Sequence, residues 1–416
     1  MRVCFVMAAL PHYFKLVLNK LTTNYDIELI LIKPSQASKS LGSGVKEDKD
    51  NTAFQLIELE EYTTWYGKSF FKDLIPTLQN IDADIVVMSS WPYFLQFVLN
   101  PFFYFQFKKL QTKLICRDIP FNVPIWGKAR EYYFSSQNLT EDFSTDKKTL
   151  KGFIALWGLS VLRKVYLNIA DAHINYIDEA YEIIGSYGVP KEKIFVTANS
   201  PDTDELLAAN DKVKTLPPIL PQNPYRSIHV GRLVKWKRVD LIIETLKNLE
   251  SKYPEIELIV VGYGPAEAEL KAQTQLLGLE KKVKFIGGIY EAVELGRYLH
   301  SSSIYVLAGM GGLSINDAMC FEKPVVCSMA DGTEKRLVKE GQNGYYFENG
   351  NVESLTKVLD LMLSDPAKVE KFSKESLRII EEEINIHTVL DEYMRAFKFL
   401  KTTTPPYHPT PYIIHK

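Results

Sequence analysis

Short runs of β-branched residues alternate with helical stretches along the first part of the chain, and this alternation restricts the fold more than any other feature. Residues 3–7 and 27–32 have the pattern of strands on either side of a helical stretch at 13–21, and strand-like runs recur at 85–88 and 113–116. Strands that alternate with helices build parallel sheets from βαβ units. The sequence therefore predicts the α/β class.

The same pattern starts again at residue 228, where SIHVGRL precedes a helical stretch (239–249) and the strand-like runs ELIVVG and VKFIGG. Since single cores seldom grow beyond roughly 250–300 residues, a chain of 416 residues with a second start predicts two domains. Between the halves, the four prolines of TLPPILPQNPY cannot continue a helix or a central strand. We predict a Rossmann-like domain at 1–205, a linker at 206–226, a second Rossmann-like domain at 227–385, and a C-terminal segment at 386–416 whose helix returns to the first domain before a proline-rich tail.

Composition excludes several classes of protein. The net charge of −2 provides no general attraction to nucleic acid. The four cysteines, Cys4, Cys116, Cys320 and Cys327, form no CxxC pair, which predicts buried free thiols rather than disulfides or a zinc site. The start, MRVCFVMAAL, is similar to a short signal peptide, but a first βαβ unit explains the same residues. We expect a cytoplasmic protein.

Two loops carry the chemistry, because doubly wound sheets bind ligands where strands end. In SIYVLAGMGGLSINDAMC, a strand leads through glycines into a helix that begins near Leu313, and such a turn favours phosphate through its free amides. In VGRLVKWKRVD, Arg232 and Lys237 follow a strand and suit a diphosphate. The alternatives are an ordinary tight turn and, because Lys235 and Arg238 are equally charged, a solvated basic loop.

Together these segments resemble glycosyltransferase family 4, the retaining enzymes with the GT-B fold. The segments VGRLVKWK, LIVVGYGP, VKFIGGI, GLSINDAMCFEKPVV and GQNGYYF occur in the family's order and spacing over residues 228–395. In the first half, ADAHINYIDEAYEIIGSYGVPKEKIFVTANSPDTDEL is similar to the segment that leads into the family's linker. The resemblance implies two Rossmann-like domains with facing parallel sheets, the first binding the acceptor and the second the nucleotide-sugar donor.

The resemblance also implies roles for single residues. Arg232 and Lys237 would bind the donor diphosphate and stabilise the leaving group, and Asp317 would accept hydrogen bonds from the ribose. The main chain around Ile286 and Gly287 would meet the base. The other implied donor-binding positions are Gly231, Gly262, Gly264, Gly309, Gly311, Gly312, Leu313 and Ser314.

The sequence departs from the family at two places. The family has two glutamates with seven residues between them, where this chain has Gly309 and Asp317. Gly309 lacks the carboxylate that would contact the donor sugar, so an inactive homologue stays an alternative. The family often has a histidine after a first-domain strand that faces the donor; here the strand TKLIC ends in Arg117 and Asp118, one of which would occupy that place. Asp118 would orient or deprotonate an acceptor hydroxyl, and Arg117 and His12 would contact the acceptor, unless these residues are merely structural or solvated.

We expect no essential metal and no other cofactor. The triplet DTD at 202–204 fits the metal-binding DxD pattern, but so does DAD at 82–84, which shows how little three residues specify. A metal-held diphosphate would duplicate the work of Arg232 and Lys237.

Two apolar segments raise the question of a membrane. No residue from 85 to 107 is charged, but Pro92 and Pro101 interrupt the run and residues 85–88 are needed as a core strand, so we do not expect a transmembrane span. We interpret this segment and residues 152–170 as core helices. The alternative is that they press into a bilayer interface beside Lys108 and Lys109.

The sequence therefore predicts a retaining hexosyltransferase of polysaccharide assembly, cytoplasmic or peripheral at the cytoplasmic face of the membrane. It would move a hexose-type sugar from a nucleotide-diphosphate sugar to a glycan or lipid-linked acceptor. The alternatives are a non-catalytic sugar-nucleotide-binding homologue or assembly subunit, and a nucleotide-sugar epimerase.

Overall fold

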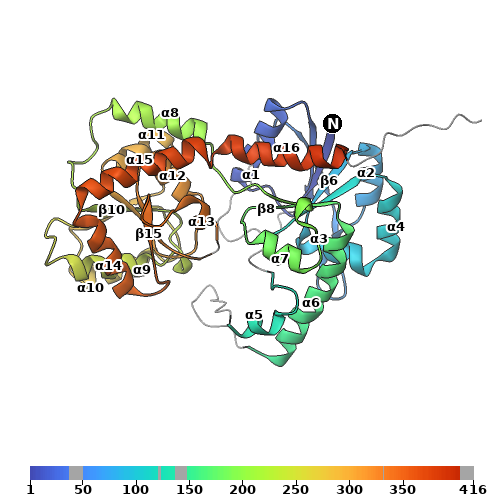
Figure 1. Ribbon diagram of the computed structural model, residues 1–416, viewed down its shortest axis with the longest axis horizontal. Helices are drawn as coiled ribbons and strands as arrows, with labels where there is room; N and C mark the ends of the chain where they lie inside the picture. Colours follow the sequence, from blue (N-terminus) through green and yellow to red (C-terminus); the bar gives the residue numbers. More distant parts are fainter. Residues whose placement is uncertain (37–49, 120–122, 136–147, 331, 403–416) are drawn as a thin grey trace, which may run out of the picture.

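Two parallel sheets, each flanked by helices, form the two halves of the molecule in the computed structural model (Figure 1). The structure describes residues 1–36, 50–119, 123–135, 148–330 and 332–402. The proline-rich tail predicted at the C-terminus lies outside these residues from position 403 onward. The α/β class and the pair of facing parallel sheets are confirmed.

The first sheet has seven strands in the order β3-β2-β1-β6-β7-β8-β9, and every adjacent pair is parallel. Its strands are nearly continuous apolar runs, since helices flank both faces. Its strands are β1 (Arg2–Val6), β2 (Glu28–Pro34), β3 (Gln55–Leu59), β6 (Ile85–Ser89), β7 (Lys113–Arg117), β8 (Ala172–Asn175) and β9 (Ile194–Val196). The other elements of this half are the hairpin β4 (Glu61–Thr63) and β5 (Ser69–Phe71), the 3-10 turn η2 (Lys191–Lys193), and the helices α1 (His12–Asn24), α2 (Leu74–Ile81), α3 (Ser90–Leu99), α4 (Pro101–Lys109), α5 (Ala129–Ser135), α6 (Leu150–Ile169) and α7 (Ala180–Ser186).

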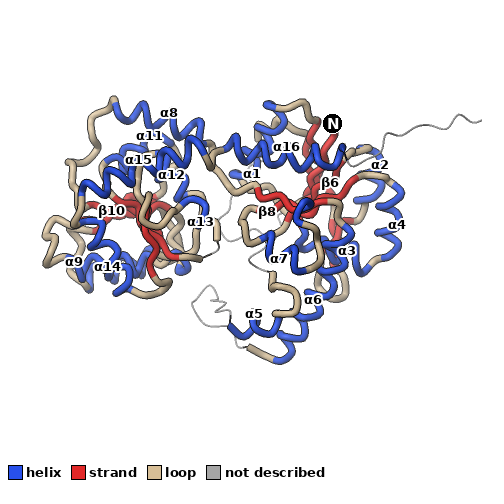
Figure 2. The backbone as a smooth tube through the Cα atoms, viewed as in Figure 1, coloured by secondary structure: helices blue, strands red, loops and turns tan. Residues whose placement is uncertain are grey.

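The second sheet has six parallel strands in the order β12-β11-β10-β13-β14-β15. Figure 2 shows its strands in red around β10, with helices around them. Its strands are β10 (Arg226–Val230), β11 (Glu257–Val261), β12 (Val283–Gly287), β13 (Ile304–Leu307), β14 (Val325–Ser328) and β15 (Gly344–Phe347). Its helices are α8 (Thr203–Lys214), α9 (Val239–Leu249), α10 (Glu267–Leu276), α11 (Ala292–His300), α12 (Ser314–Cys320), α13 (Glu334–Leu337), α14 (Val352–Leu363) and α15 (Pro366–Glu382), with a 3-10 turn η3 (Lys235–Lys237). The strand order reverses between β10 and β13, and ligands bind at such switch points.

The chain crosses between the halves twice. Helix α8 packs against α11 and α12 of the second half, so a helix occupies the first part of the range predicted as linker, 206–226. At the second crossing, Ile384 belongs to the core of the second half and Ile386 to that of the first. From there the last helix, α16 (Ile386–Thr402), runs back along α1, β8 and β9 (Figure 1).

The four cysteines are buried and free, as the sequence predicts. Cys4 and Cys116 lie in strands β1 and β7, Cys320 in α12 and Cys327 in β14. Burial raises the pKa of the Cys4, Cys320 and Cys327 thiols, which keeps them protonated and unreactive.

The apolar run at 85–107 folds as β6, α3 and most of α4, so the predicted core strand is confirmed. Among the residues that the structure describes, no helix has the length and apolar character needed to cross a bilayer. The interpretation of 152–170 as a core helix is wrong in part, because α6 leaves Ile154 and Trp157 exposed.

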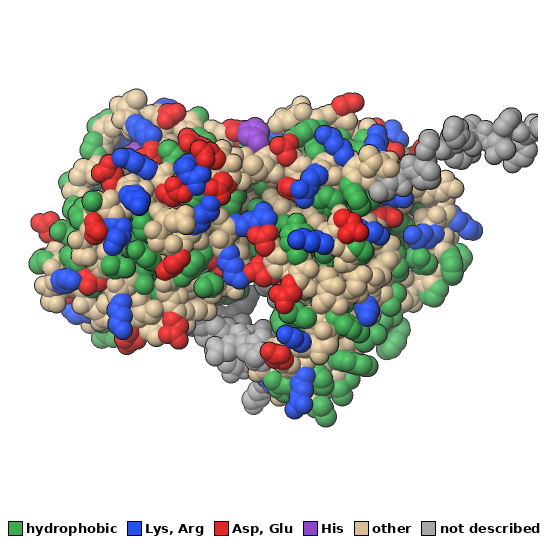
Figure 3. Space-filling view, in the orientation of Figure 1, with side chains coloured by type: hydrophobic (Ala, Val, Ile, Leu, Met, Phe, Trp, Pro, Cys, Tyr) green, Lys and Arg blue, Asp and Glu red, His purple; other side chains and the backbone are tan. Residues whose placement is uncertain are grey.

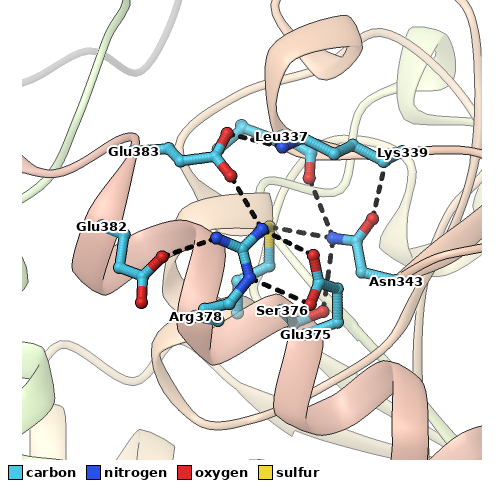
Figure 4. A network of polar contacts seen from close by, with 9 residues as sticks. Leu337, Lys339, Asn343, Glu375, Ser376, Arg378, Glu382 and Glu383 are labelled. Carbon is cyan, nitrogen blue, oxygen red and sulfur yellow. Dashed lines mark hydrogen bonds and ion pairs between the residues drawn. The ribbon is translucent and has the colours of Figure 1, made fainter.

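A polar network joins α15 to the loop before β15 (Figure 4). The buried amide of Asn343 donates to the Leu337 carbonyl oxygen (2.9 Å) and accepts from the Lys339 main-chain N–H (2.7 Å). Its Nδ2 also lies 3.4 Å from Ser376 Oγ on α15. Nearby, the exposed Arg378 bonds the carboxylates of Glu375, Glu382 and Glu383. The GQNGYYF segment is thus held in place largely by Asn343.

Candidate active site

A cavity of about 370 Å³ lies between the two halves, and both sheets present strand ends and helix starts to it. From the first half it is lined by His12, Tyr13, Tyr176, Ala198 and Asn199. From the second half and the crossing it is lined by Gly312, Leu313, Asn316, Thr333, Arg336, Leu337 and Ile384.

Lys237 lies at the switch point of the second sheet, beside this cavity. It ends η3, and its side chain is buried. Its Nζ donates hydrogen bonds to the carbonyl oxygens of Met310 (2.8 Å) and Gly311 (2.6 Å), in the loop between β13 and α12. A Cβ at Gly312, which lines the cavity, would lie 3.2 Å from the same Nζ. The predicted cation and the predicted glycine loop therefore meet.

Gly309 explains why the loop approaches η3 so closely. The Met310 main-chain N–H donates to the Trp236 carbonyl oxygen (2.9 Å), and a Cβ at Gly309 would lie 2.0 Å from that oxygen. A side chain at position 309 does not fit this packing. The absence of the family's first glutamate is thus coupled to the contact between the loop and η3.

Gly262 and Gly264 support the loop that carries Arg232. A Cβ at Gly262 would lie 1.9 Å from the Gly231 carbonyl oxygen, and one at Gly264 would lie 2.2 Å from that of Leu233. Both glycines therefore let the loop after β11 pack on the main chain of the loop after β10. The half-buried Arg232 lies between Gly231 and Leu233, whose carbonyl oxygens make these two contacts.

Two further donor-site candidates, Ile286 and Gly287, end β12 beside this loop. The Gly262 main-chain N–H donates to the Gly287 carbonyl oxygen (2.8 Å). Ile286 and Gly287 are both half-buried at the end of the strand. This is the edge of the sheet to which the resemblance assigns the base.

Helix α12 carries Ser314 and Asp317, neither of which is among the described residues that line the cavity. The Tyr305 hydroxyl donates to Ser314 Oγ (2.7 Å), so this side chain is held towards the sheet. Asp317 lies in the first turn of α12, and burial raises its pKa to about 7. Its carboxyl group therefore changes charge near neutral pH, which is frequent among functional groups.

Arg117 and Asp118 have internal partners. Arg117 Nε donates to the Tyr393 hydroxyl (3.1 Å), and its guanidinium lies 4.3 Å from the centroid of the Phe14 ring. The buried Asp118 accepts from the Ile119 N–H (2.8 Å), and its other carboxylate oxygen lies 3.7 Å from Arg163 Nε. Three acceptor-side residues were predicted: His12, Arg117 and Asp118. Of these, only His12 is among the described residues that line the cavity.

Both DxD triplets are engaged within the protein. Asp202 caps α8 and pairs with Lys20 (3.1 Å), and Asp204 pairs with Lys20 (3.0 Å) and His387 (2.8 Å). Asp84 accepts from the main-chain N–H of Arg2 (2.7 Å). Across the part of the chain that the structure describes, no cluster of three or more His, Cys, Asp or Glu suits a metal ion.

Sequence reasoning missed several residues of the cavity. Arg336 joins the halves, since its Nε donates to Asp178 (2.7 Å), and Asn316 Nδ2 on α12 lies 3.4 Å from the Asn199 carbonyl oxygen. The missed residues that follow the ends of β8, β9 and β14, namely Tyr176, Asn199, Thr333 and Arg336, were detectable by reading past every strand end. The spacing of glycines and cations alone does not reveal them.

Comparisons with known proteins show similarity to glycosyltransferases. Residues 216–378 match the family model of glycosyl transferases group 1. An uncharacterised glycosyltransferase of Haemophilus influenzae is 30% identical over 184 residues, which is 42% of this chain and 51% of that protein. A poly(ribitol-phosphate) alpha-N-acetylglucosaminyltransferase of Staphylococcus aureus is 28% identical over 41% of this chain and 34% of its own length. The alignments thus span about half of these relatives or less.

Solved structures extend the likeness in fold to nearly the whole chain. The Anabaena protein HepE, crystallised with UDP, superposes with a TM-score of 0.67 at 15% identity and covers 96% of this chain and 100% of its own. The fold is that of the GT-B glycosyltransferases, and the match to the glycosyl transferases group 1 model lies in the second half of the chain.

Proposed function

We propose that this protein transfers a hexose-type sugar from a nucleotide-diphosphate sugar to a glycan or lipid-linked acceptor, with retention of configuration. The observation that carries the proposal is the position of Lys237, whose buried ammonium lies against the glycine loop beside the interdomain cavity. A cation fixed there stabilises the negative charge that develops on a departing diphosphate. The alpha linkage in the name of the Staphylococcus aureus relative supports retention.

In this proposal the second half binds the donor. Arg232, on the loop supported by Gly262 and Gly264, and Lys237 hold the diphosphate, while Asp317 accepts hydrogen bonds from the ribose. Because the two side chains supply the positive charge, we propose that no metal ion is essential. The acceptor enters from the side of His12 and Tyr13, so that binding both reactants in one cavity excludes water and brings their reacting groups together.

The test is turnover. The full chain is incubated with each member of a panel of nucleotide sugars, with and without a glycan or lipid-linked acceptor, and products are identified by mass spectrometry. We expect a glycosylated acceptor and a free nucleoside diphosphate from one donor. An altered donor sugar formed without acceptor would instead identify an epimerase.

Gly309 favours one other candidate, a homologue that binds the donor without using it. The close contact between Gly309 and Trp236 leaves no room for a carboxylate beside the donor sugar. Donor binding without turnover on any acceptor would support this candidate against the transferase.

A further inference from the structure

Helix α6 carries large apolar side chains on its outward face as well as on the face that packs on the core. Leu150, Ile154, Trp157 and Val165 are exposed by 70%, 56%, 56% and 50%, and their spacing places them on one face. Ser160 and Arg163 of the same helix are buried. Tyr166 and Leu167 are buried as well, so α6 packs one apolar face on the core and leaves a second apolar face exposed.

The inward face of α6 is fixed by specific contacts, so the helix cannot rotate to hide the apolar side chains. Arg163 lies 5.4 Å from the centroid of the Phe94 ring and 3.7 Å from the carboxylate of Asp118. Tyr166, one turn beyond Arg163 on the same side, is fully buried. The outward face is therefore a stable feature of the fold.

Neighbouring helices add to this apolar surface. Phe134 on α5, which packs against α6, is 51% exposed, and Phe102 and Phe105 on α4 are 71% and 63% exposed. In Figure 3, hydrophobic side chains gather along the projecting arm formed by α5 and α6 and over α4. Exposed apolar side chains that gather in one region often mark a surface for a protein or membrane partner.

The charged residues on the described part of this side are mostly basic, although α5 carries the exposed Glu131 beside Arg130. Lys151 is exposed at one end of α6 and Lys164 lies near the other, and α4 ends in the exposed Lys108 and Lys109. The helices α3, α4 and α6 contain no aspartate or glutamate. Because the whole chain has a net charge of −2, the attraction to anions is local to this side of the first half.

We propose that the arm formed by α5 and α6 docks on an anionic lipid bilayer, with the exposed face of α6 in the interface. This goes beyond sugar transfer and does not depend on it. Tryptophan and flanking lysines suit the boundary between lipid tails and headgroups, where the lysine ammonium groups reach the phosphates. Each lysine near an anionic surface strengthens binding about fivefold.

A second copy of the chain suits this surface less well. A twofold interface would pair the arm with itself and bring two copies of α6 together. Each copy has lysines and no acidic residue, and on the described part of the arm only Glu131 of α5 would oppose these like charges. A projecting arm also fits a plane better than a groove (Figure 1).

The experiment is flotation of the full chain with vesicles of phosphatidylcholine alone or with phosphatidylglycerol added. The variant Ile154→Glu/Trp157→Glu places charge on the outward face of α6. The matched control is Leu276→Glu, because Leu276 on α10 of the second half is 86% exposed. Thermal unfolding of each variant confirms that the fold is retained.

We expect the wild-type protein and Leu276→Glu to float with anionic vesicles and to bind neutral vesicles at least tenfold more weakly, because the lysines act together. The double variant should lose roughly tenfold or more of its binding to anionic vesicles while unfolding at the same temperature. Equal binding by the double variant and the control would overturn the proposal. A second result would also overturn it: wild-type protein that does not bind anionic vesicles but forms a dimer, while the double variant is a monomer. The surface would then join two copies of the chain.

Discussion

Gly309 and Trp236 are in main-chain contact, since a Cβ at position 309 would lie 2.0 Å from the Trp236 carbonyl oxygen. The contact fixes the loop after β13 against η3, and Lys237, the next residue after Trp236, bonds two carbonyl oxygens of the same loop. The packing of one glycine thus determines where the proposed diphosphate-binding cation lies.

Replacing Gly309 should therefore disturb both stability and donor binding. We expect Gly309→Ala to lower the free energy of unfolding by about 1–3 kcal/mol, because main-chain atoms must move apart. Restoring the family's carboxylate with Gly309→Glu should weaken nucleotide binding for the same reason.

Chemical denaturation and calorimetry check this prediction. The control is Gly185→Ala in α7, where an added Cβ meets no atom within 4 Å. A Gly309→Ala variant as stable as the control, with unchanged nucleotide affinity, would contradict the importance of the contact.

The stability of the protein should depend on pH through Asp317, whose pKa burial raises from 3.8 to about 7. Since the folded state binds this proton more tightly than the unfolded state, the contribution is complete below about pH 4 and is lost as pH rises through about 7. Asp317→Asn should therefore stabilise the protein by about 2 kcal/mol at pH 8 and by much less at pH 4.

Thermal and chemical unfolding of the wild-type protein and of Asp317→Asn across this pH range measure the difference in their free energies of unfolding. The contributions of the other titrating groups cancel in this difference. A difference that is independent of pH would show that Asp317 is ionised freely in the folded protein. If the ribose binds the carboxylate, donor binding should also release protons near pH 7, and Asp317→Asn should abolish that release.

Asn343 should be important for the second half of the molecule. Asn343→Ala leaves the Leu337 carbonyl and the Lys339 N–H without their buried partner, and we expect a loss of about 1–3 kcal/mol in the free energy of unfolding. The exposed neighbour Gln342 provides the control, Gln342→Ala, which should have little effect. Equal stabilities of the two variants would mean that the network in Figure 4 adds nothing.

Removing divalent metal should leave donor binding intact, because the proposal assigns the diphosphate to two cationic side chains. Calorimetric titrations are compared in EDTA and in excess Mg²⁺. Binding that requires Mg²⁺ would contradict this part of the proposal and would assign the charge compensation to a metal ion.

Much of the fold is predictable because each strand carries its own signal. The strands β1, β2, β6 and β7 are apolar runs bounded by turns, and α9 was predicted at its observed bounds, 239–249. Local pattern does not reveal which sheet a helix joins: α8 lies in the range predicted as linker, yet it packs on α11 and α12. Local sequence pattern also does not distinguish the exposed face of α6 from the buried face, because apolar residues of this helix occur on both faces.

The candidate site was predictable where residues adjacent in sequence act together. Lys237 and the 309–312 glycines belong to two loops, each with its own signal, and the parallel sheet brings them together. Arg336 and Tyr176 follow strand ends, which makes them candidates from sequence, but that they line one cavity depends on how the two halves meet, which local sequence does not encode. The internal partners of Arg117 and Asp118, on α16 and α6, are equally distant along the chain.

The most direct measurement is calorimetric titration of a nucleoside diphosphate panel into the wild-type protein, Lys237→Met and Lys235→Met. Lys235 belongs to the same turn but pairs with Glu269 (3.3 Å), so it is the matched control. The account predicts that one nucleoside diphosphate binds the wild type and Lys235→Met alike, and that Lys237→Met weakens it roughly 10- to 100-fold, as expected for the loss of a charge-assisted hydrogen bond. Equal affinities of the wild type and Lys237→Met would contradict the proposed site.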